Sequence, residues 1–324
     1  MQKSRRALLQ GAAATLAFPA IVHAQGTWPN KPIRCIVPLP PGGGTDTMGR
    51  RAMQRLSEAL GQPVVVDNKA GAGGTIGSDI VAKAEPDGYT IGIATASSHS
   101  AAPVFRKDLP YDPVKSFTAI TMLGTTPYIL IGGPAAKAKD LKEVIANAKA
   151  ADGKMTCASV GVSTLGYLLT KQFEQIAGVK FTDITYRGSA LAYPELMNGT
   201  VAVMLDNPSG SAGLVRDGKL NAYAVTRRSP VLPNVPTFDS LGIKGFDAVF
   251  WYGVVAPAGF PMEYAQRIQK ALADGFLSGP GAESLRGMDV EPVMSTPQEF
   301  GAAIAKQTAD LKALADRLGI KPTE

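Results

Sequence analysis

The chain has 324 residues, is 45% hydrophobic and 19% charged, and carries a formal net charge of +6. The length indicates two domains, and the composition is that of a soluble globular protein. Because the lysines and arginines form no stripe, the mildly basic charge fits small anionic ligands and excludes a nucleic-acid partner.

The first 24 residues have the features of a secretory signal peptide. Lys3, Arg5 and Arg6 precede an uncharged apolar run, 7–22, and Val22-His23-Ala24 places small or aliphatic residues where a signal peptidase reads. The run is shorter than the roughly 20 residues that cross a bilayer. We therefore expect cleavage and a location in the periplasm. The SRRALLQ segment resembles a twin-arginine signal, so both Sec and Tat export remain open.

Strand and helix patterns alternate in the first part of the mature chain. Strands are predicted at 33–39, 63–68 and 89–95, with helices over roughly 46–60 and 75–83. In the first helix, Met48, Ala52, Leu56 and Leu60 form an apolar face at i, i+4 spacing. This alternation predicts a mostly parallel sheet with helices on both faces.

A second α/β unit begins near Thr125. Its strands are predicted at 127–134, 154–161, 181–186, 201–207 and 220–226, and its helices at 141–150, 163–177, 189–198 and 209–217. The unit has a usual domain length.

The C-terminal part contains one predicted strand, 250–259, and then helices over about 262–277, 281–286 and 297–318. These elements cannot bury a core alone, so we expect them to return to the first unit. The sequence thus predicts two α/β lobes facing each other across a ligand cleft. Residues 27–124 with 248–324 form lobe 1, residues 125–247 form lobe 2, and the chain crosses near 123–126 and 245–250.

The two cysteines are expected to be buried and unpaired. Cys35 lies in the predicted strand IRCIVPL and Cys157 in MTCASVG, which belong to different lobes. Each is best explained as a small apolar residue in its own core.

Glycine-rich turns follow the first two strands, in PLPPGGGTD (38–46) and NKAGAGGTIGSD (68–79). Each turn opens a helix, whose free N–H groups and dipole make an anion site, and Thr45 or Asp46 is a candidate N-cap. The first turn lacks the Gly-Lys-Ser/Thr ending of a phosphate-binding loop, and neither turn matches G-x-G-x-x-G. We therefore expect no nucleotide cofactor. The alternative is that both are tight turns without a ligand role.

The second unit has three more turns of this kind. The first, 158–167, contains Ser159, Ser163 and Thr164. The second, 185–191, contains Arg187-Gly188-Ser189, and the third, 204–210, contains Asp206. Each alone is explained by N-capping. Together with the first two turns they predict helix N-termini on both sides of the cleft, which suits a ligand with anionic ends.

Catalytic or metal chemistry finds little support in the sequence. After removal of the signal peptide one histidine remains, His99 in TASSHSAAP, which we interpret as a polar loop residue or ligand contact. A metal site built on histidine and cysteine clusters lacks the ligands, so no metal is expected.

Several segments together resemble one family. They follow the order and spacing of segments in the periplasmic receptors of tripartite tricarboxylate transporters, the TctC-like or Bug-type family. The segments are WPNKPIRCIVPLPPGGGTD, LGQPVVVDNKAGAGGTIGSDIVAKAEPDGYT, LPYDP, YRGSA, LPNVPTF and WYGVVAPAG. The resemblance covers nearly the whole mature chain. It implies a type II periplasmic-binding-protein fold, in which each mostly parallel sheet has one antiparallel strand just after a crossing.

The resemblance also implies a set of ligand-binding residues. They are Pro41, Gly42, Gly43, Gly44, Thr45, Asp46, Ala72, Gly73, Gly74, Ser97, Ser98, His99, Ser159, Gly161, Ser163, Thr164, Tyr167, Arg187, Gly188, Ser189 and Asp206. Ser163, Thr164, Tyr167 and Arg187 stand where the family commonly has glycine, serine, histidine and lysine. The identity of the carboxylate therefore stays open, and an aromatic acid beside Tyr167 is included.

The sequence predicts a monomeric receptor without enzymatic activity or cofactor. It captures a small di- or tricarboxylate and delivers it to the membrane subunits of a tripartite tricarboxylate transporter. Two alternatives remain, an extracytoplasmic sensor of the same ligand and an enzyme on the same two-lobe fold.

Overall fold

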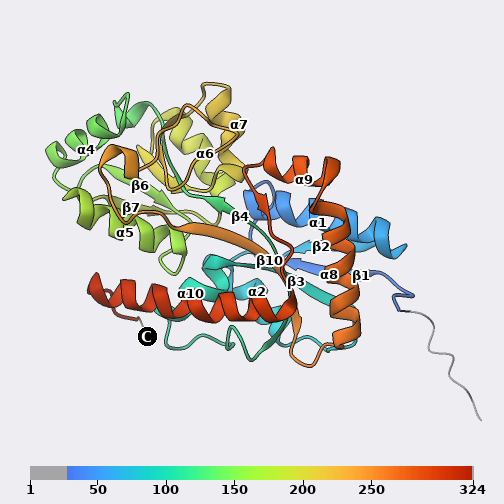
Figure 1. Cartoon of the computed structure of the whole chain (residues 1–324). Coiled ribbons are helices and arrows are strands. Elements are labelled where there is room, and N and C mark those ends of the chain that lie inside the picture. The colour runs from blue at the N-terminus through green and yellow to red at the C-terminus, as the bar shows by residue number, and fades with distance from the viewer. Residues whose placement is uncertain (1–27, 323–324) are drawn as a thin grey trace, which may run out of the picture.

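The computed structural model describes residues 28–322, which form two β-sheets surrounded by helices (Figure 1). The sheet built from the first and last parts of the chain lies below the sheet built from the middle part in this view. The predicted two-lobe α/β fold is confirmed. The predicted signal peptide, 1–24, falls outside the described residues.

The first sheet has six strands in the order β11-β4-β10-β3-β1-β2. Their bounds are β1 Ile33–Val37, β2 Val64–Asn68, β3 Thr90–Thr95, β4 Phe117–Pro127, β10 Val249–Pro257 and β11 Glu291–Pro292. β1 is parallel to β2 and β3, whereas β10 is antiparallel to β3 and β4. The pairing of β10 with β3 joins the C-terminal part of the chain to the first sheet.

The second sheet has five strands in the order β7-β6-β8-β5-β9. Their bounds are β5 Ile129–Gly132, β6 Thr156–Ser159, β7 Thr182–Thr185, β8 Val203–Asp206 and β9 Asn221–Val225. β6 is parallel to β7 and β8, and β5 is antiparallel to β8 and β9. The expected antiparallel strands are thus β5 and β10. The short β11 is also antiparallel, to β4, and is too brief to leave a sequence pattern.

The long strand β4 was not predicted over most of its length. It pairs with β10 from Phe117 to Pro127, with two register irregularities. Its sequence, FTAITMLGTTP, mixes threonine and glycine with apolar residues, and its burial neither alternates nor runs continuously. β10 supplies the ladder partner that local sequence cannot reveal.

The α-helices mostly follow the strands and cover the sheets. They are α1 Gly44–Leu60, α2 Thr75–Ala82, α3 Ala102–Phe105, α4 Leu141–Ala150, α5 Leu165–Ala177, α6 Ser189–Asn198, α7 Pro208–Arg216, α8 Met262–Phe276, α9 Gly279–Arg286 and α10 Pro297–Arg317. Short turns of other helix types are η1 Ala72–Gly74, η2 Ala96–Ala101, η3 Pro134–Ala136 and η4 Asp239–Leu241. The predicted apolar face of α1 is buried at Met48, Ala52, Leu56 and Leu60.

The chain passes between the sheets at Tyr128 and again between β9 and β10. Thr226 ties these passages together. Its amide donates to the Tyr128 carbonyl at 2.8 Å, and its hydroxyl donates to the Ala248 carbonyl at 2.7 Å. The same hydroxyl accepts from the Tyr128 amide at 2.9 Å. The crossings therefore form one hydrogen-bonded unit.

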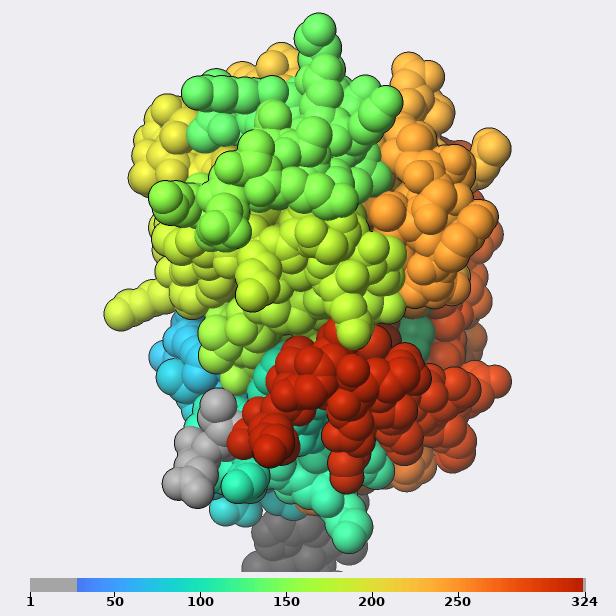
Figure 2. Space-filling model, turned by 90° about the vertical axis from the view of Figure 1, so that its left-hand side faces the viewer, coloured from blue at the N-terminus to red at the C-terminus, as the bar shows by residue number. Residues whose placement is uncertain are grey.

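The two lobes are in contact in this structure. Figure 2 shows the middle part of the chain, green to yellow-green, resting directly on α10, red. Cys35 in β1 and Cys157 in β6 are buried and unpaired, one in each sheet. Burial raises the pKa of each thiol to about 12, so both remain protonated inside their cores.

Candidate functional site

An enclosed cavity of about 40 Å³, here called the interlobe cavity, lies where loops of the two sheets meet. The first-sheet side contributes residues 39–40 and 43–45, Gly73, Ser97 and Phe250; the other side contributes Tyr128, 158–160, Thr164, 166–167, 188–190 and 204–207. Most of these residues follow the carboxyl end of a strand or open the next helix. Ligands of parallel α/β sheets bind at this edge.

The turn before α1 presents bare backbone to the cavity. Gly43 is the N-cap of α1 and no side chain caps the helix, so the prediction of Thr45 or Asp46 as the cap was wrong. The amides of Gly44 and Thr45 donate no hydrogen bond within residues 28–322. They are unpaired N–H donors at the positive end of a 17-residue helix.

Asp46 does not cap α1 because its carboxylate is engaged elsewhere. It accepts hydrogen bonds from Arg50 at 2.9 Å, from the Gly42 amide at 3.0 Å and from Asn68 at 2.8 Å. Burial raises the pKa of this carboxyl, but these hydrogen bonds outweigh burial and hold the pKa below its ordinary value. The hydrogen bond between Asp46 and Gly42 thus stabilises the glycine turn, and neither residue lines the cavity.

The second glycine turn reaches the opposite lobe. Ala72, Gly73 and Gly74 have φ values of 47°, 66° and 101°, the left-handed region that glycine favours. A Cβ added at Gly73 would lie 2.9 Å from Thr164 Cγ2. Only a residue without a side chain therefore lets this turn approach the loop before α5.

In the loop after β3, Ser97 lines the cavity but the next two residues, Ser98 and His99, do not. Ser97 Oγ accepts a hydrogen bond from the Leu165 amide at 3.3 Å, which links the two lobes. Ser98 turns back to cap the loop with Thr95, and His99 is fully buried beside Phe117, with ring centroids 4.6 Å apart. Burial lowers the pKa of His99 to about 3, so the ring is neutral. His99 does not line the cavity, contrary to the expected ligand contact.

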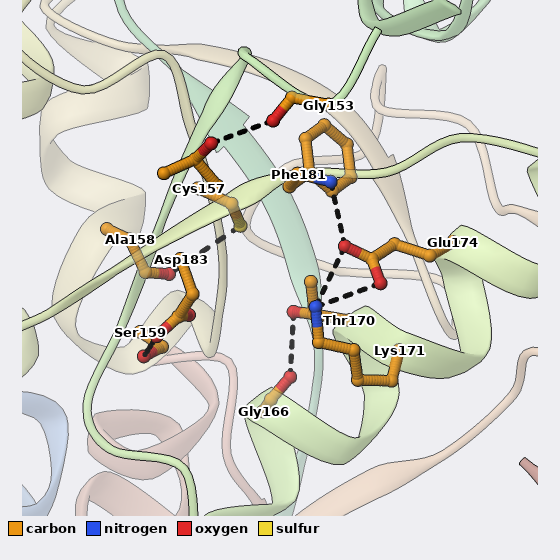
Figure 3. A network of polar contacts seen from close by, with 11 residues as sticks. Gly153, Cys157, Ala158, Ser159, Gly166, Thr170, Lys171, Glu174, Phe181 and Asp183 are labelled. Carbon is orange, nitrogen blue, oxygen red and sulfur yellow. Dashed lines mark hydrogen bonds and ion pairs between the residues drawn. The ribbon is translucent and has the colours of Figure 1, made fainter. Parts of the chain in front are cut away.

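Hydroxyl groups of the second lobe line the cavity but already serve partners in their own lobe. Ser159 Oγ donates to Asp183 Oδ2 at 3.1 Å (Figure 3). Thr164 Oγ1 donates to the Gly161 carbonyl at 2.7 Å and accepts from the Tyr167 amide as the N-cap of α5. These two hydrogens are therefore not available to a ligand unless a bond breaks.

Asp206 lies at the end of β8 in the wall of the cavity and is 4% exposed. Its carboxylate accepts from Ser189 Oγ at 2.9 Å and from Tyr193 Oη at 2.7 Å. Burial raises the pKa of this carboxyl, and the two hydroxyl donors oppose that rise without cancelling it. Asp206 thereby positions Ser189 at the start of α6, where the amides of Ser189 and Ala190 donate no hydrogen bond within the described chain.

The remaining side chains close the cavity by packing. Tyr167 lies edge-on to Phe105 of the other lobe, with ring centroids 5.9 Å apart. Tyr128 and Phe250, one from each chain crossing, meet edge-on at 6.0 Å. The sequence did not single out either crossing residue, although both are aromatic residues within the segments expected to cross.

The structure brings together about half of the residues expected at the site. Those that line the cavity are Gly43, Gly44, Thr45, Gly73, Ser97, Ser159, Thr164, Tyr167, Gly188, Ser189 and Asp206. Those that do not are Pro41, Gly42, Asp46, Ala72, Gly74, Ser98, His99, Gly161, Ser163 and Arg187. The second group belongs to the same loops, and Arg187 within it is exposed.

Further lining residues were missed because they are apolar or adjacent to the polar signals. They are Leu39, Pro40, Tyr128, Ala158, Val160, Gly166, Ala190, Met204, Leu205, Asn207 and Phe250. Their positions beside the predicted loops are the signal that could have found most of them.

Among residues 28–322, no lysine, arginine or histidine lines the interlobe cavity. Donors toward an anion include the amide N–H groups at the start of α1 and α6 and the Thr45 hydroxyl, none of which makes a hydrogen bond within residues 28–322. Within that range, no cluster of three or more histidine, cysteine, aspartate or glutamate residues could hold a metal ion, and no helix is long and apolar enough to cross a membrane.

Comparison with known proteins gives concordant matches. The family model described as the tripartite tricarboxylate transporter family receptor matches residues 48–320. Protein BugT of Bordetella pertussis is 35% identical over 91% of each chain. Rpa4515 of R. palustris, solved with adipate, is 30% identical with a TM-score of 0.89 over 91% of this chain and 100% of that one. MatC of Rhodopseudomonas palustris, with bound malate, is 27% identical with a TM-score of 0.84 over 88% and 99% of the two chains.

The family match includes parts of both lobes, and the relatives and solved structures cover about nine tenths of the chain, in agreement with the resemblance drawn from the sequence. The chain belongs to the tripartite tricarboxylate transporter family of periplasmic receptors.

Proposed function

We propose that this receptor captures a small carboxylate in the interlobe cavity and delivers it to the membrane subunits of a tripartite tricarboxylate transporter. The observation that carries the proposal is the pair of helix N-termini, α1 and α6, whose unpaired amides face one enclosed cavity from opposite lobes. Such amides and the helix dipole favour a carboxylate. Adipate and malate in two similar structures support this class of ligand.

The ligand is held by backbone dipoles rather than by cationic side chains. Since no lysine, arginine or histidine of the described part of the chain lines the cavity, specificity depends on the placement of amides and on shape. A dicarboxylate suits this arrangement because one end can meet α1 while the other meets α6. Each lobe then holds one charge, and both contacts exist together only when the lobes are closed.

A bound acid requires the lobes to lie farther apart than in this structure. The cavity of about 40 Å³ has room for a few water molecules, each of which needs on the order of 10–15 Å³ of such space. The ligand therefore enters through an open state. The sequence places residues 27–124 with 248–324 in one lobe and 125–247 in the other. Because β4 stays paired with β10 as far as Pro127, opening bends the chain just beyond that strand, near Tyr128 and Ala248.

The remaining assignments follow from this role. The receptor acts as a monomer in the periplasm after cleavage of residues 1–24, and it returns its ligand chemically unaltered. Asp206, the one carboxyl of residues 28–322 that lines the cavity, accepts hydrogen bonds from Ser189 and Tyr193, and His99 is neutral and buried away from the cavity. Neither group is placed as a general base toward a ligand.

A thermal-shift screen of the mature protein tests the proposal. Aliphatic di- and tricarboxylates, including adipate and malate, are compared with aromatic acids, amino acids and neutral sugars. A ligand at about 100 times its dissociation constant should stabilise the protein by roughly 2.7 kcal/mol. Mass spectrometry of the released acid should show no chemical change. If none of the acids raised the melting temperature while a neutral compound did, the result would contradict the proposal.

A further inference from the structure

Asn207 lies in the wall of the interlobe cavity, between the end of β8 and the start of α7. Asparagine is a favoured N-cap, yet Asn207, which occupies the N-cap position of α7, makes no side-chain hydrogen bond to its helix. The residue is half-buried and uncharged, unlike its neighbour Asp206. Its side-chain amide therefore serves groups other than the backbone of α7.

Two hydroxyl groups fix the orientation of this amide. Tyr252 donates to Asn207 Oδ1 at 2.9 Å, and Ser209 donates to the same oxygen. Apart from the contact between the two hydroxyls, neither has another partner within residues 28–322. If the amide were turned over, its N–H groups would face both hydroxyl oxygens, and at least one hydroxyl proton would have no acceptor. The amide oxygen is therefore held on the side of Tyr252 and Ser209.

The nitrogen of the same amide is left without a partner. Asn207 Nδ2 makes no hydrogen bond within residues 28–322, and it is not among the unpartnered polar atoms that are shut off from solvent. Asn207 lines the interlobe cavity, whereas Tyr252 and Ser209 do not. Since Oδ1 is held beside those two hydroxyls, Nδ2 is the end of the planar amide that is left to face the cavity.

Asn207 also lies next to the start of α1 in the other lobe. An added Cβ at Gly44, the first residue of α1, would lie 2.7 Å from Asn207 Oδ1 and 3.0 Å from the Tyr252 hydroxyl oxygen. Only a residue without a side chain therefore allows α1 to approach Asn207 this closely. The unpaired amides of Gly44 and Thr45 and the Nδ2 group of Asn207 are thus donors from two lobes around one end of the cavity.

We propose that Asn207 donates a hydrogen bond from Nδ2 to the carboxylate held at the start of α1, and so acts as a specificity-determining residue of the receptor. This inference rests on the function proposed above. One oxygen of the carboxylate accepts from an α1 amide and the other accepts from Nδ2, and both hydrogen bonds are charge-assisted. A single carboxylate then connects the two lobes. Because these groups are all donors, an ammonium group is rejected at this end of the cavity.

The variant Asn207→Asp separates the two ends of the amide. It keeps an oxygen for Tyr252 and Ser209 but replaces the N–H groups with a second oxygen. The mature protein is titrated calorimetrically with adipate, malate, citrate and phthalate, which cover aliphatic, hydroxylated, tricarboxylic and aromatic acids. Any acid that binds the unmodified protein should bind Asn207→Asp at least about tenfold more weakly. The melting temperature of the ligand-free variant should not fall, since a carboxylate suits the start of α1.

The control variant is Asn234→Asp, in the exposed loop after β9. It adds the same charge outside the interlobe cavity and should bind each acid as the unmodified protein does.

Nuclear magnetic resonance separates a lost hydrogen bond from the repulsion that the added charge also causes. The side-chain N–H pair of Asn207 is identified as the pair missing from Asn207→Asp. At saturation with a bound acid it should shift and exchange more slowly with water, while the Asn234 pair stays in place. If an acid binds but the Asn207 pair does not respond, or if Asn207→Asp binds as tightly as the unmodified protein, this inference is overturned and the proposed function stands. If none of the four acids binds, both are overturned.

Discussion

Tyr252 on β10 reaches across the cleft and donates its hydroxyl to Asn207 Oδ1 at 2.9 Å. The same hydroxyl lies 2.5 Å from Ser209 Oγ in the first turn of α7. One buried phenol of the first sheet thus holds two side chains of the second. Burial raises the pKa of Tyr252, so the hydroxyl keeps its proton and remains a donor.

Removal of this hydroxyl should weaken closure and therefore carboxylate binding. Tyr252→Phe loses a hydrogen bond that exists only when the lobes meet, which costs about 0.5–1.5 kcal/mol, or up to about tenfold in affinity. Tyr89→Phe is the control, since that hydroxyl bonds Asn30 within one lobe. Titration calorimetry measures both variants. Equal affinities in Tyr252→Phe and the unmodified protein would show that the contact does not contribute to closure.

A side chain at Gly188 should obstruct closure without straining either lobe. The φ of Gly188 is 178°, which any residue adopts, but an added Cβ would lie 2.8 Å from Pro40 Cδ of the other lobe. We expect Gly188→Ala to lower ligand affinity while unfolding of the free protein is little changed. Gly213→Ala, where an added Cβ meets nothing within 4 Å, is the control. An unaffected dissociation constant in Gly188→Ala would argue against the tight approach seen here.

Thr164 should contribute to the stability of the fold rather than as a direct donor to the ligand. Its hydroxyl caps α5 and bonds Gly161, so Thr164→Ala should lower the free energy of unfolding by about 1 kcal/mol. Denaturant titration measures this loss, and Thr164→Ser, which keeps the hydroxyl, should recover most of it. A large loss of ligand affinity at unchanged stability would instead identify the hydroxyl as a ligand contact.

Asp206 should make carboxylate binding depend on pH. Because the folded pKa of this carboxyl is raised, its protonated form is favoured in the fold, and stability falls as pH rises from 3.8 through the raised value. The ionised form also repels an anion in the same cavity. Affinity should therefore increase as pH falls through the raised pKa of Asp206. Asp206→Asn cannot ionise, so its ligand affinity should lack that part of the pH dependence. If affinity changed with pH equally in the variant and the unmodified protein, Asp206 would be excluded as the cause.

Sequence patterns predicted the fold well because its signals are local. The apolar face of α1 and the alternation of strands and helices follow from spacing alone, and glycine turns mark the carboxyl ends of strands. Most of β4 was not predicted, because this strand depends on pairing with β10, which is remote in the sequence.

At the candidate site, the loops could be predicted but the roles of their side chains could not. Asp46 and Thr164 were expected near the ligand, yet the Asp46 carboxylate is engaged by Arg50 and the Thr164 hydroxyl donates to the Gly161 carbonyl. Which partner a polar group chooses depends on three-dimensional neighbours. His99 shows the same limit, since its burial beside Phe117 follows from packing that no local pattern records.

Titration of Gly43→Val with a dicarboxylate shows whether the amides at the start of α1 bind a carboxylate directly. Gly43 lines the interlobe cavity, its φ is −82°, and an added Cβ meets nothing within 4 Å, so the variant should fold with an unchanged melting temperature. With the acid identified by the screen, we expect saturable binding to the unmodified protein and at least about tenfold weaker binding to Gly43→Val. The diester of the same acid should not bind. Unchanged affinity in a folded Gly43→Val variant, or equal binding of the diester, would contradict direct binding by these amides.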